Sequence, residues 1–145
     1  MSKIKNTYIK QDENKENTIW TFFANPKYWY VDDFLNSKKS DSEIYYSINT
    51  HHKDRFKIGD IGVIRVGKDS RNKSQLGSKG KMNSGVYAIV KVLSTPELVK
   101  DNDSEFYANK HDINKDKWRV KIKIIKNLID SPIIFNEKNK AEIGQ

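Results

Sequence analysis

The pattern of apolar and polar positions changes at Thr18. Residues 1–17 mix lysine, asparagine, glutamate and aspartate with almost no apolar side chain, so they cannot bury enough surface to offset the entropy of ordering. We predict a flexible N-terminal tail there. From residue 18 onwards apolar runs alternate with turn-forming segments, which predicts one domain over 18–133 and a C-terminal tail or linker over 134–145.

Five segments have the period-two alternation, or the β-branched and aromatic content, of β-strands. They cover residues 18–24, 43–48, 61–66, 86–93 and 118–124. In the last of them the apolar positions alternate with Arg119, Lys121 and Lys123, which places three cations on the face opposite the core. Trp118, on the apolar side of this strand, is expected to belong to the core.

A single helix is predicted after the first strand. Pro26 suits a first helical position behind an Asn25 cap, and the apolar side chains that follow share one side of a helix to about Asn36. Residues 67–84 are rich in glycine, serine and lysine, which predicts a long mobile loop, and residues 97–116 predict an acidic, irregular connection. Together these elements indicate an α+β domain, a curved sheet or small barrel with helices attached.

The formal net charge of +8 is concentrated in a short part of the chain. Residues 53–81 hold nine basic and three acidic side chains, whereas residues 1–52 hold seven of each. A local basic excess attracts polyanions and supports salt-dependent contacts with phosphate. A solvated, lysine-rich face explains the same composition, so charge alone leaves both interpretations open.

The inventory of side chains argues against several classes of site. Without cysteine there is no disulfide, thiolate zinc site or cysteine nucleophile, which fits a reducing compartment, and we expect the cytoplasm. The chain has no apolar run of about 18 residues and its N-terminus is polar, so we expect no membrane span, signal peptide or membrane partner. Adjacent His51 and His52 point apart on a strand, and His111 has no carboxylate at ligand spacing. We therefore expect no metal, no cofactor and no catalytic residues, since nucleotide, nucleophile and zinc-hydrolase motifs are also missing.

Aromatic side chains crowd between positions 20 and 46. Flat rings next to cations can hold a base that has left its stack, and each stacked base is worth about 1–3 kcal/mol. For any single ring a place in the core is the better expectation. The crowded rings are Trp20, Phe22, Phe23, Tyr28, Trp29, Tyr30, Tyr45 and Tyr46.

The order of several short motifs resembles that of EVE domains, which belong to the PUA-like superfamily together with YTH and ASCH domains. Residues 19–26, IWTFFANP, resemble the opening strand and its Asn-Pro turn, and residues 46–48 resemble the later Trp-x-Val element with tyrosine in place of tryptophan. Residues 57–64 are similar to the Gly-Asp turn and the strand behind it. Residues 85–88 and 118–122 resemble two further strands, and the likeness extends from residue 19 to about 133.

This resemblance implies a mixed β pseudo-barrel of about five to six strands flanked by short helices. It also implies a non-catalytic module that recognises methylated or hydroxymethylated cytosine, or methyladenine, in DNA by flipping the base into an aromatic pocket. EVE domains often accompany modification-dependent restriction nucleases and their GTP-driven motors, so the partner of such a module would be a fused or neighbouring nuclease or motor. The chain stops soon after Pro132, without the usual closing segment, and we therefore expect residues 134–145 to begin a linker to a further domain.

Carried over by position, the likeness assigns two sets of residues. The base pocket would be formed by Trp20, Phe23, Ala24, Asn25, Tyr46, Ser47, Ile48 and Asn49. The phosphate contacts would be His52, Lys53, Arg55, Arg65, Lys68, Arg71, Lys73, Lys79 and Lys81. Asn25 would contact the base edge through its amide, although a role as helix cap is equally consistent with its position.

Three other functions remain open at this stage. PUA-like domains commonly act on RNA, so an RNA-binding domain is the first alternative. A nuclease or base-modifying enzyme is the second. The third is a structural or protein-interaction domain in which every aromatic ring belongs to the core.

Overall fold

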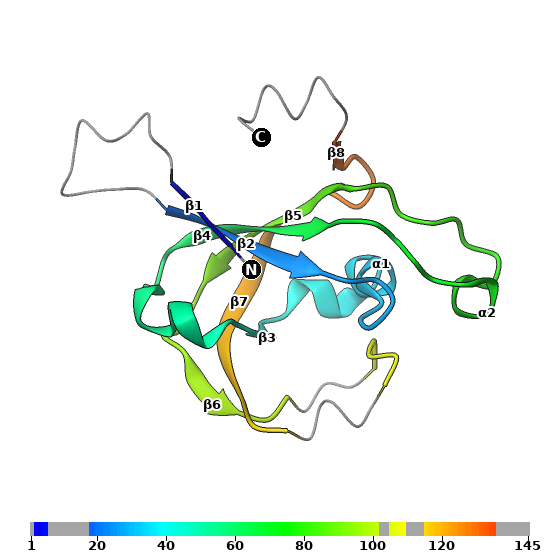
Figure 1. Ribbon diagram of the computed structural model, residues 1–145. Helices are drawn as coiled ribbons and strands as arrows, with labels where there is room; N and C mark the ends of the chain where they lie inside the picture. Colours follow the sequence, from blue (N-terminus) through cyan, green and yellow to red (C-terminus); the bar gives the residue numbers. More distant parts are fainter. Residues whose placement is uncertain (1, 6–17, 102–104, 110–114, 136–145) are drawn as a thin grey trace.

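One mixed β-sheet organises the residues that the computed structural model describes, which are 2–5, 18–101, 105–109 and 115–135. Its strands are β1 (Ser2–Lys5), β2 (Thr18–Ala24), β3 (Ile44–Ser47), β4 (Ile61–Val66), β5 (Gly85–Val92), β6 (Glu97–Val99), β7 (Lys117–Asn127) and β8 (Ile133–Ile134). The helices are short: α1 (Val31–Leu35), α2 (Lys73–Leu76) and two 3-10 helices, η3 (Lys38–Asp41) and η4 (Thr50–Arg55). Figure 1 shows their arrangement around the sheet.

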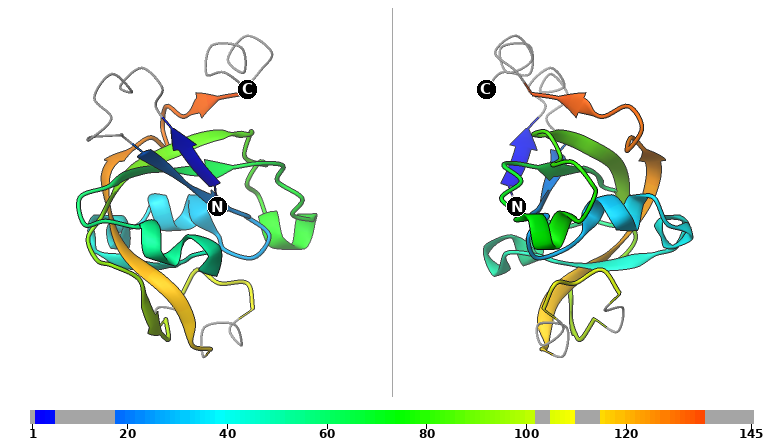
Figure 2. Two further views of the ribbon diagram at one scale, coloured as in Figure 1. Left: turned by 60° about the vertical axis from the view of Figure 1, so that its left-hand side comes forward. Right: turned by 90° about the vertical axis from the view of Figure 1, so that its right-hand side faces the viewer.

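The strand order is β1-β2-β4-β5-β7-β3, with β6 added to β7 and β8 added to β5. β2 and β4 run parallel, whereas the neighbouring pairs β4–β5, β5–β7 and β7–β3 are antiparallel. The pairing shifts register between Ile64 and Arg65 and again between Ile89 and Val90, and such bulges bend and twist a strand. The sheet therefore curls into an open half-barrel whose inner side packs against α1 (Figure 2). The predicted α+β fold, a mixed pseudo-barrel with short helices, is confirmed.

The core lies between the curled sheet and α1. Phe22 of β2, Ile64 of β4 and Val120 of β7 point inward and are fully buried, as is Phe34 of α1 at 1% exposure. Gly62 makes room for this packing, because a Cβ atom there would lie 2.6 Å from a ring carbon of Phe22. A glycine in β4 thus lets the Phe22 ring lie directly against the neighbouring strand.

The predicted helix is wrong over its first turn. Helix α1 begins only at Val31 and ends at Leu35, rather than running from residue 26 to 36. The carbonyl of Asn25 accepts bonds from the amides of Tyr28 and Trp29, and the Tyr30 amide donates to the Phe106 carbonyl at 2.7 Å. A contact with a distant segment therefore competes successfully with the local preference for helix.

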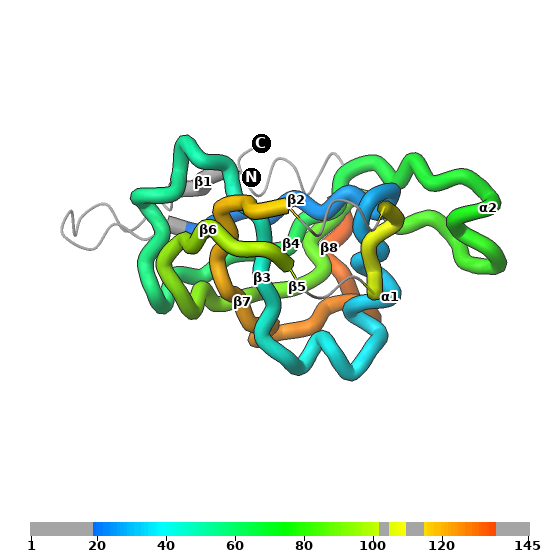
Figure 3. The backbone as a smooth tube through the Cα atoms, turned by 90° about the horizontal axis from the view of Figure 1, so that it is seen from below, coloured from blue at the N-terminus to red at the C-terminus, as the bar shows by residue number. Residues whose placement is uncertain are grey.

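The segment 67–84 is not the mobile loop that its composition predicts. It contains α2, and it is fastened to α1 by the Arg71 guanidinium, which lies between the carboxylates of Asp32 and Asp69. Asp69 also accepts a bond from the Met82 amide at 2.9 Å. Viewed from below, α2 projects at one end of the molecule, away from the β3–β4 connection (Figure 3).

The ends of the predicted domain also differ from the prediction. Ser2–Lys5 pair with residues 18–21 of β2, so this part of the predicted tail is a strand, because the edge of β2 offers unpaired backbone groups. Residues 6–17 of that tail and residues 136–145 of the predicted linker lie outside the described part of the chain. Strand β7 continues to Asn127, and its pairing with β6 buries Arg119, which the sequence places on the solvent side.

No helix within the described ranges is long and apolar enough to cross a bilayer.

Candidate functional site

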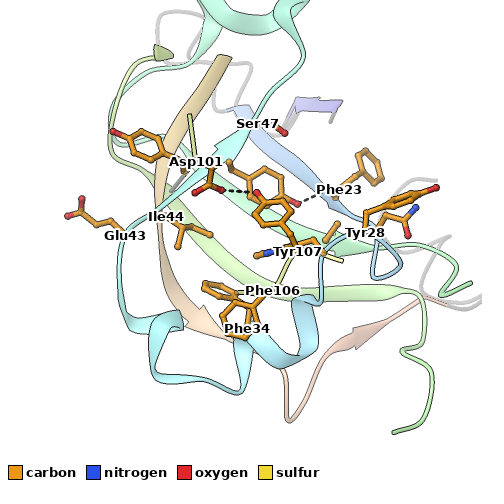
Figure 4. Close-up of a pocket in the computed structure, with 14 residues that line it drawn as sticks. Phe23, Tyr28, Phe34, Glu43, Ile44, Ser47, Asp101, Phe106 and Tyr107 are labelled. Atoms are coloured by element: carbon orange, nitrogen blue, oxygen red, sulfur yellow. Dashed lines mark hydrogen bonds between the residues drawn. The ribbon is translucent and has the colours of Figure 1, made fainter. Parts of the chain in front are cut away.

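A pocket of about 310 Å³ opens where the end of β2 approaches β3. The sheet order places β2 and β3 far apart in the ladder, and no backbone pairing joins these two strands in the described sheet. The pocket therefore occupies the seam of the half-barrel, where the curl brings the sheet back towards itself. Its lining residues, drawn in Figure 4, are Phe23, Ala24, Asn25, Tyr28, Trp29, Phe34, Glu43, Ile44, Tyr45, Tyr46, Ser47, Asp101, Phe106 and Tyr107.

Tyr46 bridges the seam. Its hydroxyl donates a hydrogen bond to the Phe23 carbonyl at 2.7 Å, and its ring meets the Phe22 ring edge-on at 5.2 Å. Burial, and then the neighbouring Tyr107, raise the pKa of the Tyr46 hydroxyl, so the group stays protonated as a donor. Trp29 contacts the same ring at 5.6 Å and nearly at right angles. The two strands are thus joined through a side chain, which leaves space beside it for a ligand.

A segment far along the chain forms the opposite wall. The Tyr30 amide donates to the Phe106 carbonyl at 2.7 Å, the Ala108 amide donates to the Tyr28 carbonyl at 2.9 Å, and Trp29 forms an isolated bridge with Tyr107. These backbone bonds hold residues 105–109 against the turn that follows β2. Rings from both segments therefore face the same cavity.

The wall includes one buried carboxylate. Asp101 is 8% exposed, and its Oδ2 accepts a hydrogen bond from the Tyr107 hydroxyl at 2.8 Å. Burial, and then the Asp101 carboxylate, raise the pKa of Tyr107, so the hydroxyl remains a donor. Figure 4 shows this pair beside the pocket, with its hydrogen bond as a dashed line.

The mouth of the pocket presents two exposed rings. Tyr28 is 59% exposed and Phe23 is 45% exposed, although both line the cavity. The Arg65 guanidinium lies 5.6 Å from the centre of the Phe23 ring and 4.4 Å from that of Phe135. Exposed rings of this size beside a cation are suited to stacking on a planar ligand.

The structure brings five of the eight predicted pocket residues together. Phe23, Ala24, Asn25, Tyr46 and Ser47 line the cavity. Asn25 also forms the turn after β2, because its Oδ1 accepts a bond from the Lys27 amide at 3.0 Å. The alternative local role therefore exists, as a turn contact rather than as a helix cap.

The other three predicted pocket residues lie elsewhere. Trp20 is fully buried, stacks on Phe56 at 3.9 Å and donates through its Nε1 to Asp60 at 2.9 Å. Ile48 packs against the core, and Asn49 caps η4 by accepting a bond from the His51 amide. The assignment of Trp20 is wrong because β2 alternates: Trp20 and Phe22 face the core, while Phe23 faces outward.

Sequence reasoning missed most of the far wall. Tyr28, Trp29 and Tyr45 belong to the noted crowd of rings but were not assigned to the pocket. Phe34 was expected only on the apolar side of the helix, and nothing pointed to the segment that contains Asp101, Phe106 and Tyr107. The available signal was a pair of adjacent rings at 106–107 within an otherwise polar connection. Two adjacent rings in a polar segment are expected either to pack in the core or to contact a ligand.

The predicted phosphate contacts fall into three groups. Arg71 is 1% exposed and paired with Asp32 and Asp69, so it is not available to a phosphate, and this assignment is wrong. Four others already have partners: Lys79 pairs with Asp33 at 2.8 Å, and Lys53 lies 4.3 Å from the Trp118 ring. Arg65 lies 4.4 Å from the Phe135 ring, and His52 lies near Trp20. Lys53 and half-buried Trp118 thus meet at the surface, which corrects the assignment of Trp118 to the core. Cations on exposed positions are Arg55, Lys68, Lys73 and Lys81.

The 67–84 segment, which carries several of these lysines, is connected to the mouth of the pocket. Gln75 of α2 donates through its Nε2 to the Lys27 carbonyl at 3.1 Å, next to Tyr28 in the chain. Lys79 lies 5.8 Å from the Tyr30 ring. None of the described lining residues is itself a lysine or arginine, so the positive charge lies beside the cavity rather than inside it.

Within the described ranges, no group of three or more histidine, aspartate or glutamate side chains could hold a metal ion.

Comparison with known proteins gives likenesses of fold at low sequence identity. No protein-family model and no curated protein matches the chain. Among solved structures, the DUF55 domain of human thymocyte nuclear protein 1 is similar with a TM-score of 0.42 and 13% identity, covering 76% of this chain and 68% of that one. The human THYN1 protein in complex with DNA containing 5-methylcytosine is similar with a TM-score of 0.45 and 13% identity, covering 86% and 78%.

Proposed function

We propose that this chain is a binding module, not an enzyme, that recognises a modified base in DNA by taking the flipped base into the seam pocket. The proposed ligands are methylated or hydroxymethylated cytosine and methyladenine. The observation that carries the proposal is a cavity of about 310 Å³ lined mainly by aromatic side chains. This volume is at the lower end of the roughly 300–1,000 Å³ of small-molecule sites, which suits a single flat base.

The surroundings of the pocket support a polymeric ligand. Phe23 and Tyr28 expose their rings at the mouth, where they can stack on the neighbouring bases of an extruded nucleotide. The exposed lysines of the 67–84 segment lie on the element that Gln75 links to the same turn. A basic surface beside an aromatic pocket is the arrangement expected when phosphates position the strand and the pocket selects the base.

The resemblance to EVE domains extends this proposal to a biological role. We propose that the module supplies specificity to modification-dependent restriction in the cytoplasm, with a fused or neighbouring nuclease or GTP-driven motor as its partner. Cutting of modified, but not plain, DNA by a nuclease only when this chain is present tests that role.

The direct test is a binding panel of duplex oligonucleotides that differ in one central base. We expect tighter binding to a modified cytosine or adenine than to the plain base, and Tyr28→Ala should weaken binding to the preferred DNA by about 5- to 150-fold, the equivalent of one stacked base. Tyr28 is largely exposed, so its removal should leave the melting temperature nearly unchanged.

The matched control is Ile58→Ala, which removes an exposed apolar side chain that does not line the pocket. It should bind as the wild type does. Equal affinity for modified and plain DNA would contradict the proposal, and stronger binding to modified RNA in the same panel would favour an RNA-binding domain.

A second prediction concerns the exposed lysines near the pocket. The triple variant Lys68→Gln, Lys73→Gln, Lys81→Gln should weaken binding to all DNA alike and reduce the steepness of its salt dependence, because each lost phosphate contact releases one counterion fewer. Titrations at several salt concentrations measure the slope.

The control for charge is a triple variant on another surface. Three exposed lysines on β5 and β7 lie outside the 67–84 segment: Lys91, Lys123 and Lys126. Their replacement by glutamine removes the same net charge and should change the salt slope much less. If both triple variants change the slope equally, the 67–84 segment is not the phosphate-binding surface.

A further inference from the structure

One arginine beside the mouth of the pocket has aromatic rings as its neighbours. Arg65 of β4 is the register partner of Phe23 of β2, so the two side chains lie on the same, outer face of the sheet. The guanidinium carbon of Arg65 is 5.6 Å from the centre of the Phe23 ring and 4.4 Å from that of Phe135. Because Phe23 lines the cavity, Arg65 is one side chain away from it.

These rings do not satisfy the hydrogen-bond donors of Arg65. An aromatic face attracts a guanidinium through its π-electrons, whereas the five N–H groups point outward in the guanidinium plane and need acceptors. The Nε of Arg65 is buried without a hydrogen-bond partner, and within the described ranges no hydrogen bond or ion pair joins its guanidinium to a carboxylate. Arg71, by contrast, has two carboxylates. The ligand that suits Arg65 is therefore an anion with more than one acceptor oxygen.

The charges around the cavity give the site a direction. Its lining contains two carboxylates, Glu43 and Asp101, and Figure 4 shows Glu43 on the side of the pocket opposite to Phe23. Arg65 lies next to Phe23, on the side away from Glu43. A ligand with one anionic end is therefore expected to place that end beside Phe23 and Arg65, and its uncharged part among the rings.

A flipped nucleotide has this distribution of charge. Base flipping rotates a nucleotide about its backbone, so the two phosphates that flank it stay at the mouth while the base enters the pocket. We propose that the Arg65 guanidinium binds one of these two flanking phosphates. This inference rests on the proposed function and deepens it: the site recognises a base together with the charge of its own backbone, and Arg65 has a defined position on the strand.

The experiment changes single phosphates in the preferred DNA. A methylphosphonate linkage removes the charge of one phosphate, and it is placed on either side of the modified base or at a distant position of the same strand. Neutralising one of the flanking phosphates should weaken binding by the wild type about 10-fold. This is the low end for hydrogen bonds to charged groups, because Arg65 is only half-buried. The distant linkage should cost less, since exposed charge pairs are screened.

The same linkages are then measured with variants of Arg65. Arg65→Gln should bind the unaltered DNA about 10-fold more weakly and should lose little more when the flanking phosphate is neutralised, because both changes remove one interaction. Arg65→Lys keeps the charge without the planar fork, so it should keep part of the sensitivity. The matched control is Arg55→Gln, at an exposed arginine of η4 outside the pocket lining. It should be as sensitive to the flanking linkage as the wild type.

The outcomes separate this inference from the proposed function. If a folded Arg65→Gln protein loses as much affinity as the wild type when the flanking phosphate is neutralised, the inference is wrong. It is also wrong if Arg65→Gln weakens binding only where guanine adjoins the modified base, since a guanidinium can bind that base edge instead. In both cases a preference for modified over plain DNA keeps the proposed function. Equal binding of modified and plain DNA removes both. If Arg65→Gln does not fold, the wild type still decides, because equal losses at flanking and distant linkages overturn the inference.

Free nucleotides distinguish a DNA strand from a small ligand. One of the two monophosphates of 5-methyldeoxycytidine, 5′ or 3′, should bind the wild type more tightly than the nucleoside, and this difference should disappear in Arg65→Gln. The oligonucleotide should bind at least about 10-fold more tightly than either monophosphate, since stacking on neighbouring bases and further phosphate contacts are added. A free monophosphate that binds as tightly as the oligonucleotide would overturn both the proposed function and the inference about the strand.

Discussion

Replacing Arg71 by methionine is expected to lower the free energy of unfolding by about 3–5 kcal/mol. The guanidinium is fully enclosed, and it donates to Asp32 at 2.9 and 3.1 Å and to Asp69 at 2.8 and 3.0 Å. Methionine fills a similar volume, but it leaves the Asp69 carboxylate without its cation and Asp32 with only Lys79, whose Nζ lies 3.5 Å from Oδ2. Denaturant unfolding followed by circular dichroism measures the loss.

Lys79→Met provides the matched control. Lys79 pairs with Asp33 at 2.8 Å, but both side chains are more than one third exposed, so solvent screens the pair. The variant should lose less than about 1 kcal/mol. Equal losses in the two variants would show that the Arg71 cluster does not hold the 67–84 segment to α1.

Because of the same cluster, the free energy of unfolding should decrease as the pH falls in the acid range. Burial opposes ionisation of Asp69, but bonds from Arg71 and from the Met82 amide outweigh it and lower its pKa to about 2. For Asp32 burial is likewise outweighed by Arg71, and the pKa is lowered. A carboxyl with a lowered pKa contributes stability above its unfolded value of about 3.9 and loses it as the pH falls towards the folded value. The difference in unfolding free energy between wild type and Arg71→Met should therefore become smaller as the pH falls from about 4 to about 2.

Trp20→Ala is expected to cost about 3–5 kcal/mol of unfolding free energy. The ring is fully buried and stacked on Phe56 with an interplanar angle of 16°, and its Nε1–H bonds Asp60 at 2.9 Å. Alanine would leave a cavity between β2 and the residue after η4, and it would remove the donor from Asp60. Thermal and denaturant unfolding measure this loss.

Trp20→Phe separates the structural role from a role in the pocket. Phenylalanine keeps an aromatic ring next to Phe56 and loses the bond to Asp60, so its cost should be smaller than that of alanine. Because Trp20 does not line the cavity, this variant should bind the preferred DNA as the wild type does. If a stable Trp20→Phe protein no longer distinguishes modified from plain bases, Trp20 belongs to the binding site after all.

The position of the pocket explains why the site depends on distant parts of the chain. A complete barrel would pair β3 with β2 and close the seam, whereas here a single hydroxyl, that of Tyr46, bonds the carbonyl of Phe23 across it. The remaining space is bordered by 105–109, which the backbone bonds of Tyr28 and Tyr30 hold in place. Substitutions in the bordering segment of such a site can therefore change which ligand fits, while the sheet stays the same.

Much of the sheet was predictable from the sequence, because local alternation determines which residues can share a buried face. The predicted segments 18–24 and 61–66 match β2 and β4, and segments 43–48, 86–93 and 118–124 overlap β3, β5 and β7. The aromatic crowd correctly indicated one wall of the cavity, since Phe23 and Tyr46 both lie in it. These features depend on neighbouring residues, whose spacing is visible in one dimension.

Tertiary structure alone decided the rest. Which face of β2 is inside depends on the partner strands, so Trp20 lies in the core although the sequence assigned it to the pocket together with Phe23. By sequence alone, Arg71 is typical of a phosphate contact. In the folded chain its guanidinium is paired with the carboxylate of Asp32, 39 positions away. Asp101 joins the pocket only because the curled sheet and the bond from Tyr30 to Phe106 bring remote segments together. Long-range contacts of this kind outweigh local preference, since burial and pairing supply more free energy than propensity does.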